Sequence, residues 1–327
     1  MQRELTLELV RVTEGAALAA SRWVGRGRKD EADAAAVDAM RRLFDTVDVR
    51  AEVVIGEGEM DEAPMLYIGE LVGGAAGVEP TADVAVDPVE GTNLVAKGLP
   101  GAIAVLAMAP RGGLLRAPDC YMEKIAVGPG ARGAVSLDAP PEENVRAVAR
   151  ALGKPVEDVT VVVLDRPRHQ GIIEAVRRAG ARIRLISDGD VAAAVATGLE
   201  ETGIDLMLGT GGAPEGVLAA AALACLGGDF QGRLRPEDDA QRARIEAMGL
   251  VPWDRLLRLE DLVRSDDVIF AATGITSGDL LRGVRYTRRG AVTHSVAMRR
   301  LTGTLRFVEA VHQLDRKPVL RDIVRGA

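Results

Sequence analysis

Two acids and a tight turn follow one apolar run in the first third of the chain. The apolar, partly β-branched run 84–86 predicts a buried strand, and Asp87 stands at its end. Pro88 removes a backbone donor, so we expect the strand to stop there. Glu90 follows, and Gly91-Thr92 permits a turn with free N–H groups. This arrangement suits a divalent cation and a phosphate oxygen, although a strand-ending turn with solvated acids would have the same pattern.

Three further acids stand where expected elements begin or end. Asp33 lies in the first turn of an expected helix, where a carboxylate also simply complements the helix dipole. Glu57 belongs to the acidic, glycine-containing stretch 56–62, directly after an expected strand. Glu215 lies at the start of another expected helix. Each acid is either structural or a metal ligand, and the position of Glu57 favours cation binding.

Three expected strands in the second half each end in a polar or glycine-rich loop. These loops are residues 165–169, 187–190 and 209–215. Arg166 and Arg168 offer planar guanidinium groups suited to phosphate, and acids of the second loop suit sugar hydroxyls. Surface charge is the alternative for each loop. Three such loops at successive strand ends favour a ligand site.

The elements that would position these residues follow from hydrophobic periodicity. In the first part we expect helices over 3–24, 31–46 and 65–72, and strands over 51–55, 101–109, 125–127 and 133–137. In the second half strands alternate with helices, which predicts an α/β fold with a largely parallel sheet. A hairpin is expected over 282–297. The break at Gly153-Lys154-Pro155 suggests two domains, residues 1–157 and 158–327.

Composition excludes several classes of protein. The 327 residues carry a net charge of −7 and only 3% aromatic residues, so nucleic acid and anionic membranes are not expected partners. Two cysteines without CxxC spacing and three histidines give little support to a zinc site. No signal-like or membrane-spanning apolar stretch is present, so we expect a cytoplasmic protein. P-loop, GxSxG and complete dinucleotide-binding motifs are absent.

An acidic oxygen-ligand cluster together with arginine loops suits metal-assisted phosphoryl hydrolysis with Mg²⁺ or Mn²⁺. The same residues carry a family resemblance. The hexamer Asp87-Pro88-Val89-Glu90-Gly91-Thr92 resembles the signature of lithium-sensitive, metal-dependent sugar phosphatases. The wider set resembles the bacterial class II, GlpX-type fructose-1,6-bisphosphatases. It comprises segments 32–33, 54–59, 61–70, 117–119, 121–122, 167–169, 188–191, 211–216 and 272–276.

The resemblance implies roles for individual residues. It implies metal ligands at Asp33, Glu57, Asp87, Glu90 and Glu215. It implies catalytic roles for Thr92, Asp33 and Glu57, with Thr92 and Asp33 acting on the attacking water. The implied substrate contacts are Glu90, Gly91, Thr92, Tyr121, Arg166, Pro167, Arg168, Asp188, Gly189, Asp190 and Gly212.

The resemblance also implies a fold and an activity. The fold is a layered α/β/α/β/α sandwich of the sugar phosphatase type, whose first part has a mainly antiparallel sheet. We expect residues 1–157 to form a metal-binding catalytic domain and residues 158–327 a substrate-binding domain. The expected reaction is hydrolysis of the 1-phosphate of fructose 1,6-bisphosphate, as in gluconeogenesis, by a homo-oligomer, a dimer or a tetramer.

Other activities remain open at the level of sequence. The loops 165–169 and 185–190 are closer to the branch that also accepts sedoheptulose 1,7-bisphosphate. Another sugar or inositol monophosphatase is a nearer alternative, although two arginines in one loop argue for a second phosphate. A non-catalytic sugar-phosphate sensor is an alternative from a different class.

Overall fold

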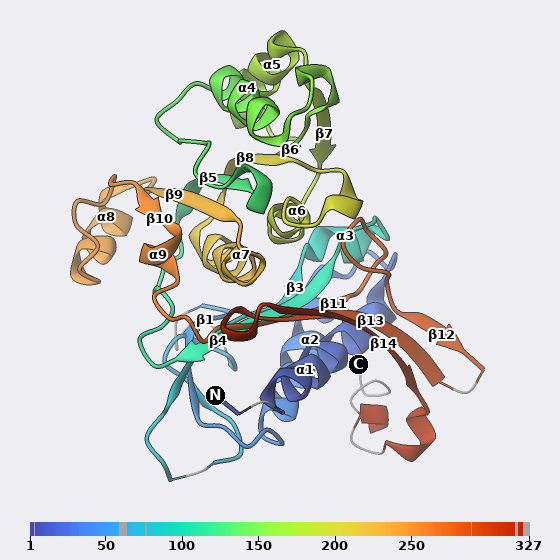
Figure 1. The fold of residues 1–327 in the computed structure, drawn as a ribbon. Coiled ribbons are helices and arrows are strands. Elements are labelled where there is room, and N and C mark those ends of the chain that lie inside the picture. Colours follow the sequence, from blue (N-terminus) through green and yellow to red (C-terminus); the bar gives the residue numbers. More distant parts are fainter. Residues whose placement is uncertain (3, 59–63, 76, 289, 318–319, 323–327) are drawn as a thin grey trace. The chain divides into compact units, whose positions relative to one another are not determined.

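Segments from both ends of the chain form the first of two compact units (Figure 1). The computed structural model describes residues 1–327 except 3, 59–63, 76, 289, 318–319 and 323–327. Unit 1 comprises Met1–Leu114 and Ser265–Ala327, and unit 2 comprises Leu115–Arg264. This division differs from the expected boundary near residue 157, because strand pairing joins the last third of the chain to the first.

Unit 1 is built on an eight-stranded sheet in the order β12-β13-β11-β4-β3-β1-β2, with β14 beside β13. The strands are β1 (Ala51–Ile55), β2 (Leu71–Val72), β3 (Ala82–Glu90), β4 (Ile103–Pro110), β11 (Ile269–Gly274), β12 (Arg285–Thr287), β13 (Gly290–Arg299) and β14 (Thr304–His312). Among the described residues of this sheet, only β1 and β3 pair in parallel, so it is mainly antiparallel, as the resemblance implied. Strands β12 and β13 form the expected hairpin.

Two amphipathic helices pack against one face of this sheet. They are α1 (Leu5–Ala20), which continues into a 3₁₀ turn (Ser21–Trp23), and α2 (Lys29–Phe44). Leu9, Val12 and Ala16 recur at helical spacing and are buried in one core with Val84 and Leu106 of the sheet. Both helices were expected from this spacing. A short helix, α3 (Thr92–Lys97), follows the end of β3.

Two expectations for unit 1 are wrong. Residues 65–72 form no helix, because their backbone groups bond to β1 and the residues after it: the Ile68 N–H donates to the Gly58 carbonyl and the Gly69 N–H to the Val53 carbonyl. Strand β3 also does not stop at Pro88. It continues to Glu90 through a register shift after Asp87, and such an irregularity is a place where a strand tolerates proline.

Unit 2 is built on a six-stranded sheet in the order β10-β9-β5-β8-β6-β7. Its strands are β5 (Tyr121–Val127), β6 (Thr160–Leu164), β7 (Arg182–Ile186), β8 (Leu206–Gly212), β9 (Asp229–Arg235) and β10 (Leu257–Arg258). Strands β7, β6 and β8 are parallel, but β5 is antiparallel to both β8 and β9. The expected largely parallel sheet is therefore only half correct, because β5 enters between β8 and β9.

Helices cover both faces of the second sheet (Figure 1). Helices α4 (Pro141–Leu152) and α5 (Gln170–Ala179) pack on one face, and α6 (Asp190–Ala196) and α7 (Ala213–Leu226) lie on the other. Two further helices, α8 (Asp239–Ala247) and α9 (Leu259–Leu262), follow β9. Both units are thus mixed α/β, which confirms the expected fold class.

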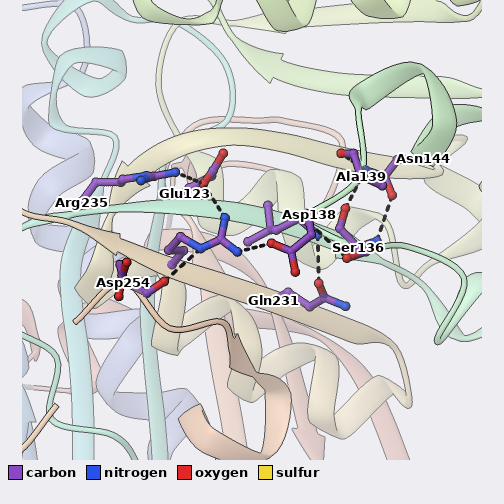
Figure 2. A network of polar contacts seen from close by, with 10 residues as sticks. Glu123, Ser136, Asp138, Ala139, Asn144, Gln231, Arg235 and Asp254 are labelled. Atoms are coloured by element: carbon purple, nitrogen blue, oxygen red, sulfur yellow. Dashed lines mark hydrogen bonds and ion pairs between the residues drawn. The ribbon is translucent and has the colours of Figure 1, made fainter. Parts of the chain in front are cut away.

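The segment 133–137 was expected to be a strand and is irregular instead. Its backbone bonds to side chains rather than to a neighbouring strand, as Figure 2 shows for part of the network. The N–H groups of Ser136 and Leu137 donate to Asn144 Oδ1 and Gln231 Oε1 at 2.9 and 3.0 Å. Asn144 returns a hydrogen bond to the Ser136 carbonyl at 2.8 Å. These side chains replace a strand partner, so apolar periodicity alone was misleading.

Arg235 of β9 continues this network (Figure 2), and Arg233 of the same strand also takes part in it. Arg235 Nη2 donates to Glu123 Oε2 at 2.7 Å, and Arg233 pairs with Asp138 and donates from Nε to the Asp254 carbonyl at 3.1 Å. These basic residues of unit 2 therefore serve the structure. Among the described residues, no helix is both long and apolar enough to cross a membrane.

Candidate active site

The parallel pairing of β1 and β3 brings two of the predicted acids to one edge of the sheet in unit 1. Ile55, the last residue of β1, pairs with Ala85 of β3. Glu57 and Asp87 each stand two residues after this pair, Glu57 just beyond β1 and Asp87 within β3 at its register shift. Two acids that are 30 positions apart in sequence (87 − 57) therefore occupy corresponding places along neighbouring segments.

Helix α2 adds a third acid, Asp33, whose carboxyl group hydrogen-bonds that of Glu57. Burial raises the pKa of Glu57 to about 8, and the neighbouring Asp33 carboxylate adds to this effect. Burial also raises the pKa of Asp33, opposed by the hydrogen bond from Glu57. One proton between two acids relieves their repulsion. A divalent cation would relieve the same repulsion, so this pair fits a metal site.

The remaining predicted residues of unit 1 lie where β3 passes into α3. Asp87 Oδ1 accepts a hydrogen bond from the Val89 N–H at 3.1 Å, and Glu90 is buried. Gly91 has φ = +92°, a conformation that favours glycine, and Thr92 begins α3. The tight turn expected at Gly91-Thr92 is therefore confirmed.

Complete metal coordination is not assembled in the part of the chain that the structure describes. No three Asp, Glu, His or Cys side chains among the described residues are arranged to hold one ion. The close pair is Asp33 with Glu57. The acids predicted at residues 59, 61 and 62 lie outside the described residues. The five-carboxylate ligand set therefore remains a prediction.

In unit 2, Arg168 is held in place by its neighbours. Its Nε and Nη2 donate to the Thr210 carbonyl at 3.2 and 2.7 Å, and its guanidinium carbon lies 4.9 Å from the centre of the Tyr121 ring. Tyr121 begins β5 and pairs in register with Gly212 of β8. Arg166 donates from Nη1 to the Asp165 carbonyl at 3.3 Å. Tyr121, Arg168 and Gly212 thus lie at one end of the second sheet, as the loop positions suggested.

His169 is a structural residue beside these arginines. It is buried, its Nδ1 lies 2.8 Å from the Leu164 carbonyl, and its Nε2 accepts the Thr210 N–H at 2.8 Å. The carbonyl requires a proton on Nδ1, and the N–H requires none on Nε2. Burial lowers the pKa of His169, in keeping with this neutral form. The ring therefore fixes loop 165–169 against β8 and is not needed as a ligand.

The predicted residues after β7 and β8 meet at a buried lysine that sequence reasoning missed. Gly189 has φ = +90° at the start of α6, and Asp190 Oδ2 accepts a hydrogen bond from Lys124 Nζ at 2.8 Å. Lys124 belongs to β5 and is buried. A lysine in the apolar alternation Met122, Lys124, Ala126 was the one available signal.

Glu215, in the first turn of α7, has a carboxylate oxygen with an unmet demand. Its Oε2 is buried and has no hydrogen-bond partner among the described residues. Burial raises the pKa of Glu215, while nearby Lys124 opposes that rise. A Cβ atom at Gly212 would lie 2.0 Å from Oε2, so this carboxylate fits only because residue 212 is glycine. A buried, unsatisfied carboxylate oxygen is suited to a cation.

Comparisons with known proteins identify the family. A family model described as bacterial fructose-1,6-bisphosphatase, glpX-encoded, matches residues 3–312. The chain is 48% identical over 330 residues to fructose-1,6-bisphosphatase 1 class 2 of Escherichia coli K12, covering 97% of each chain. It is 47% identical over 339 residues to D-fructose 1,6-bisphosphatase class 2/sedoheptulose 1,7-bisphosphatase of Synechococcus sp. strain JA-3-3Ab, covering 96% of this chain and 97% of the relative. The chain therefore belongs to the bacterial, glpX-encoded fructose-1,6-bisphosphatase family.

Proposed function

We propose that this protein is a metal-dependent phosphatase that hydrolyses the 1-phosphate of fructose 1,6-bisphosphate to give fructose 6-phosphate. Membership of the family, together with the hydrogen-bonded acids Asp33 and Glu57, carries the proposal. Two half-buried carboxylates side by side repel each other unless a proton or a cation lies between them, and a protein keeps such a pair where a cation or a reaction uses it.

We assign the metal ligands to Asp33, Glu57, Asp87, Glu90 and Glu215, the set that the family resemblance implied. When bound there, Mg²⁺ or Mn²⁺ would polarise the phosphate and lower the pKa of a water molecule. The unsatisfied Glu215 Oε2 and the Asp33–Glu57 pair are the features of this chain that suit such ions.

The chain's own residues would orient the reactants. The Thr92 hydroxyl, at the first position of α3, would hold the attacking water, and Asp33 would accept its proton. The N–H groups of Gly91 and Thr92 would donate to the reacting phosphate. Asp87 and Glu90 lie on the same turn, so binding the phosphate there brings it beside the predicted ligands.

Unit 2 would bind the rest of the substrate. Arg168 donates from Nε and Nη2 to the Thr210 carbonyl, which fixes the orientation of its guanidinium group. Nη1 would then donate to the distal phosphate. Arg166 would contribute a second cation, with Pro167 fixing the backbone between them. Tyr121, Gly212, Asp188 and Gly189 would contact the sugar. A second phosphate-binding group favours a bisphosphate over a monophosphate.

A phosphate-release panel tests this function. Purified protein with Mg²⁺ or Mn²⁺ should release one phosphate from fructose 1,6-bisphosphate and little from fructose 6-phosphate or inositol 1-phosphate. Glu90→Gln should lower the rate by about 100-fold or more. Glu79→Gln, which changes an exposed acid of unit 1, is the matched control and should keep the rate. Full activity of Glu90→Gln, or ligand binding without phosphate release, would contradict the proposal.

A second substrate is favoured by one specific observation. The Synechococcus relative carries the name of a dual fructose-1,6/sedoheptulose-1,7-bisphosphatase. The same panel should therefore include sedoheptulose 1,7-bisphosphate, and a kcat/KM within about tenfold of that for fructose 1,6-bisphosphate would make this protein a dual enzyme.

We also propose that the protein forms a homo-oligomer through β14. This nine-residue strand ends the sheet of unit 1, and the described residues include no strand on its outer side. Leu305, Phe307 and Val311 lie on one face of it, with 38%, 43% and 70% of their surface exposed. An open, apolar edge of this length is a site for pairing with another strand. A cytoplasmic location remains an expectation from sequence.

A further inference from the structure

Unit 2 contains a buried ion pair that the reaction described above does not use. Lys124 and Asp190 have only 1% and 6% of their surface exposed, and Lys124 Nζ lies 2.8 Å from Asp190 Oδ2. Burying an ammonium group is costly unless a carboxylate compensates it, and the converse holds for the aspartate. Removing either residue would therefore leave the other as a buried charge without compensation.

The surroundings are shaped to keep this pair in one place. In register, Lys124 of β5 stands between Gly209 of β8 and Gly232 of β9. A Cβ atom at Gly211 would lie 2.0 Å from Asp190 Oδ2 and 3.1 Å from Lys124 Nζ. The pair thus fits only against a bare backbone, and it joins the start of α6 to the sheet.

Two acids, buried Asp190 and half-buried Glu215, lie near the buried Lys124. Lys124 and Asp190 both act electrostatically on Glu215, which carries the unsatisfied Oε2. The hydrogen bond of the Lys124 ammonium goes to Asp190. Glu215 Oε2 is left buried and without a hydrogen-bond partner among the described residues.

The geometry points to Lys124 as a positioning residue for the proposed metal site: by occupying Asp190, it leaves Glu215 as the carboxylate available to a divalent cation, and it anchors the loop 187–190. This inference rests on the proposed function, since it takes Glu215 as a ligand. It also changes the expectation for Asp190, whose Oδ2 is used by Lys124 rather than by a sugar hydroxyl. Asp188 and Gly189 then carry the sugar contacts of this loop.

The decisive experiment measures Mn²⁺ binding by calorimetry, with kcat and KM measured beside it. Lys124→Met keeps the length of the side chain and removes its charge. Asp190 then becomes a buried anion without a partner and competes with Glu215 for the ion. We expect Mn²⁺ affinity to change by at least tenfold, and kcat to fall with it. The double variant Lys124→Met/Asp190→Asn removes both charges and should return Mn²⁺ affinity to within about threefold of the wild type.

A matched control separates positioning from stability. Lys154 and Asp205 form a similar pair in unit 2, with Nζ and Oδ1 2.6 Å apart and the aspartate side chain buried. Lys154→Met should lower the melting temperature but leave Mn²⁺ affinity unchanged. Unchanged Mn²⁺ affinity in Lys124→Met would overturn the inference. If Lys124→Met does not fold, the double variant decides: affinity near that of the wild type supports the inference, and affinity weaker by tenfold or more overturns it.

The outcome is distinguishable from failure of the proposed function. If the wild-type protein binds Mn²⁺ but releases phosphate from no sugar bisphosphate, the function fails, while the comparison of Mn²⁺ affinities still tests the role of Lys124. If the wild-type protein is active and Lys124→Met leaves Mn²⁺ affinity unchanged, as the Lys154→Met control should, the function stands and the inference fails.

Discussion

At the scale of single residues, the candidate site contains carboxylates whose charge or hydrogen-bonding capacity is not fully compensated by the described residues. Asp33 and Glu57 share a hydrogen bond, and Glu215 has a buried oxygen without a hydrogen-bond partner among the described residues. Sequence could identify these acids as candidates from their positions at strand and helix ends. It missed Lys124, because a lysine inside a strand normally lies on an exposed face, and only its place in the apolar alternation of β5 indicates that it is buried.

Gly212 tests the role of Glu215 without removing a charge. A Cβ atom there would lie 2.0 Å from Glu215 Oε2, so Gly212→Ala should displace the carboxylate. We expect kcat to fall by about 10- to 100-fold and Mn²⁺ affinity to weaken, with far-ultraviolet circular dichroism unchanged. Gly171→Ala is the control, because its Cβ would meet no atom within 4 Å and it lies in α5. That variant should keep its activity and gain up to about 1 kcal/mol in stability. Equal activity in both variants would remove Glu215 from the site.

At the scale of elements, apolar runs and apolar spacing predicted strands and helices that are buried in the core. The expected strand 51–55 and helix 31–46 correspond to β1 and α2. The prediction failed where side chains rather than a neighbouring strand bond the backbone, as Asn144 and Gln231 do for segment 133–137. Apolar spacing does not record such bonds, so these segments could not be assigned from sequence.

The contact between Asp33 of α2 and Glu57, just beyond β1, allows a prediction about the stability of the metal-free protein. Glu57→Gln replaces a shared proton with a permanent N–H donor to Asp33, so the metal-free protein should become more stable by about 1–3 kcal/mol. Its gain in melting temperature on adding Mn²⁺ should be much smaller than that of the wild type, and activity should be lost. Glu52→Gln changes an acid of the same strand that pairs with Arg111 at 3.7 Å, and it should alter neither stability by more than about 1 kcal/mol nor the Mn²⁺ response. A Glu57→Gln protein less stable than the wild type would show that repulsion between the Asp33 and Glu57 carboxyl groups does not destabilise the metal-free protein.

At the scale of the whole molecule, the order of segments along the chain does not predict which residues form each compact unit. Unit 2 is inserted between two segments of unit 1, and strand β11 returns to pair with β4. The sequence signal at residues 153–155 marks only the end of α4 and the start of the following turn. Pairing between residues more than 150 positions apart leaves no local pattern, so composition could not place the boundary.

The proposed association of two copies through β14 also follows from pairing rules. If β14 pairs antiparallel with its copy about Val308, Leu305 lies opposite Val311 of the copy, Arg306 lies opposite Ala310, and no like charges face each other. Such a register places the two Val308 Cα atoms about 4.5–5.5 Å apart, within the range that a disulfide bridges. We therefore expect Val308→Cys to form a covalent dimer on mild oxidation, seen on a non-reducing gel and located by peptide mapping.

An exposed cysteine outside the strand provides the comparison for this cross-link. Leu301 is 60% exposed in the turn before β14, so Leu301→Cys reports collisions between copies that do not pair through the strand. Phe307→Asp, made in the otherwise wild-type chain, places a charge on the exposed face of β14. This variant should be more monomeric than the wild type in light scattering, because a desolvated aspartate opposes edge pairing. Cross-linking of Val308→Cys no faster than that of Leu301→Cys, or an unchanged mass for Phe307→Asp, would move the contact between copies to another surface and leave β14 as an uncovered edge.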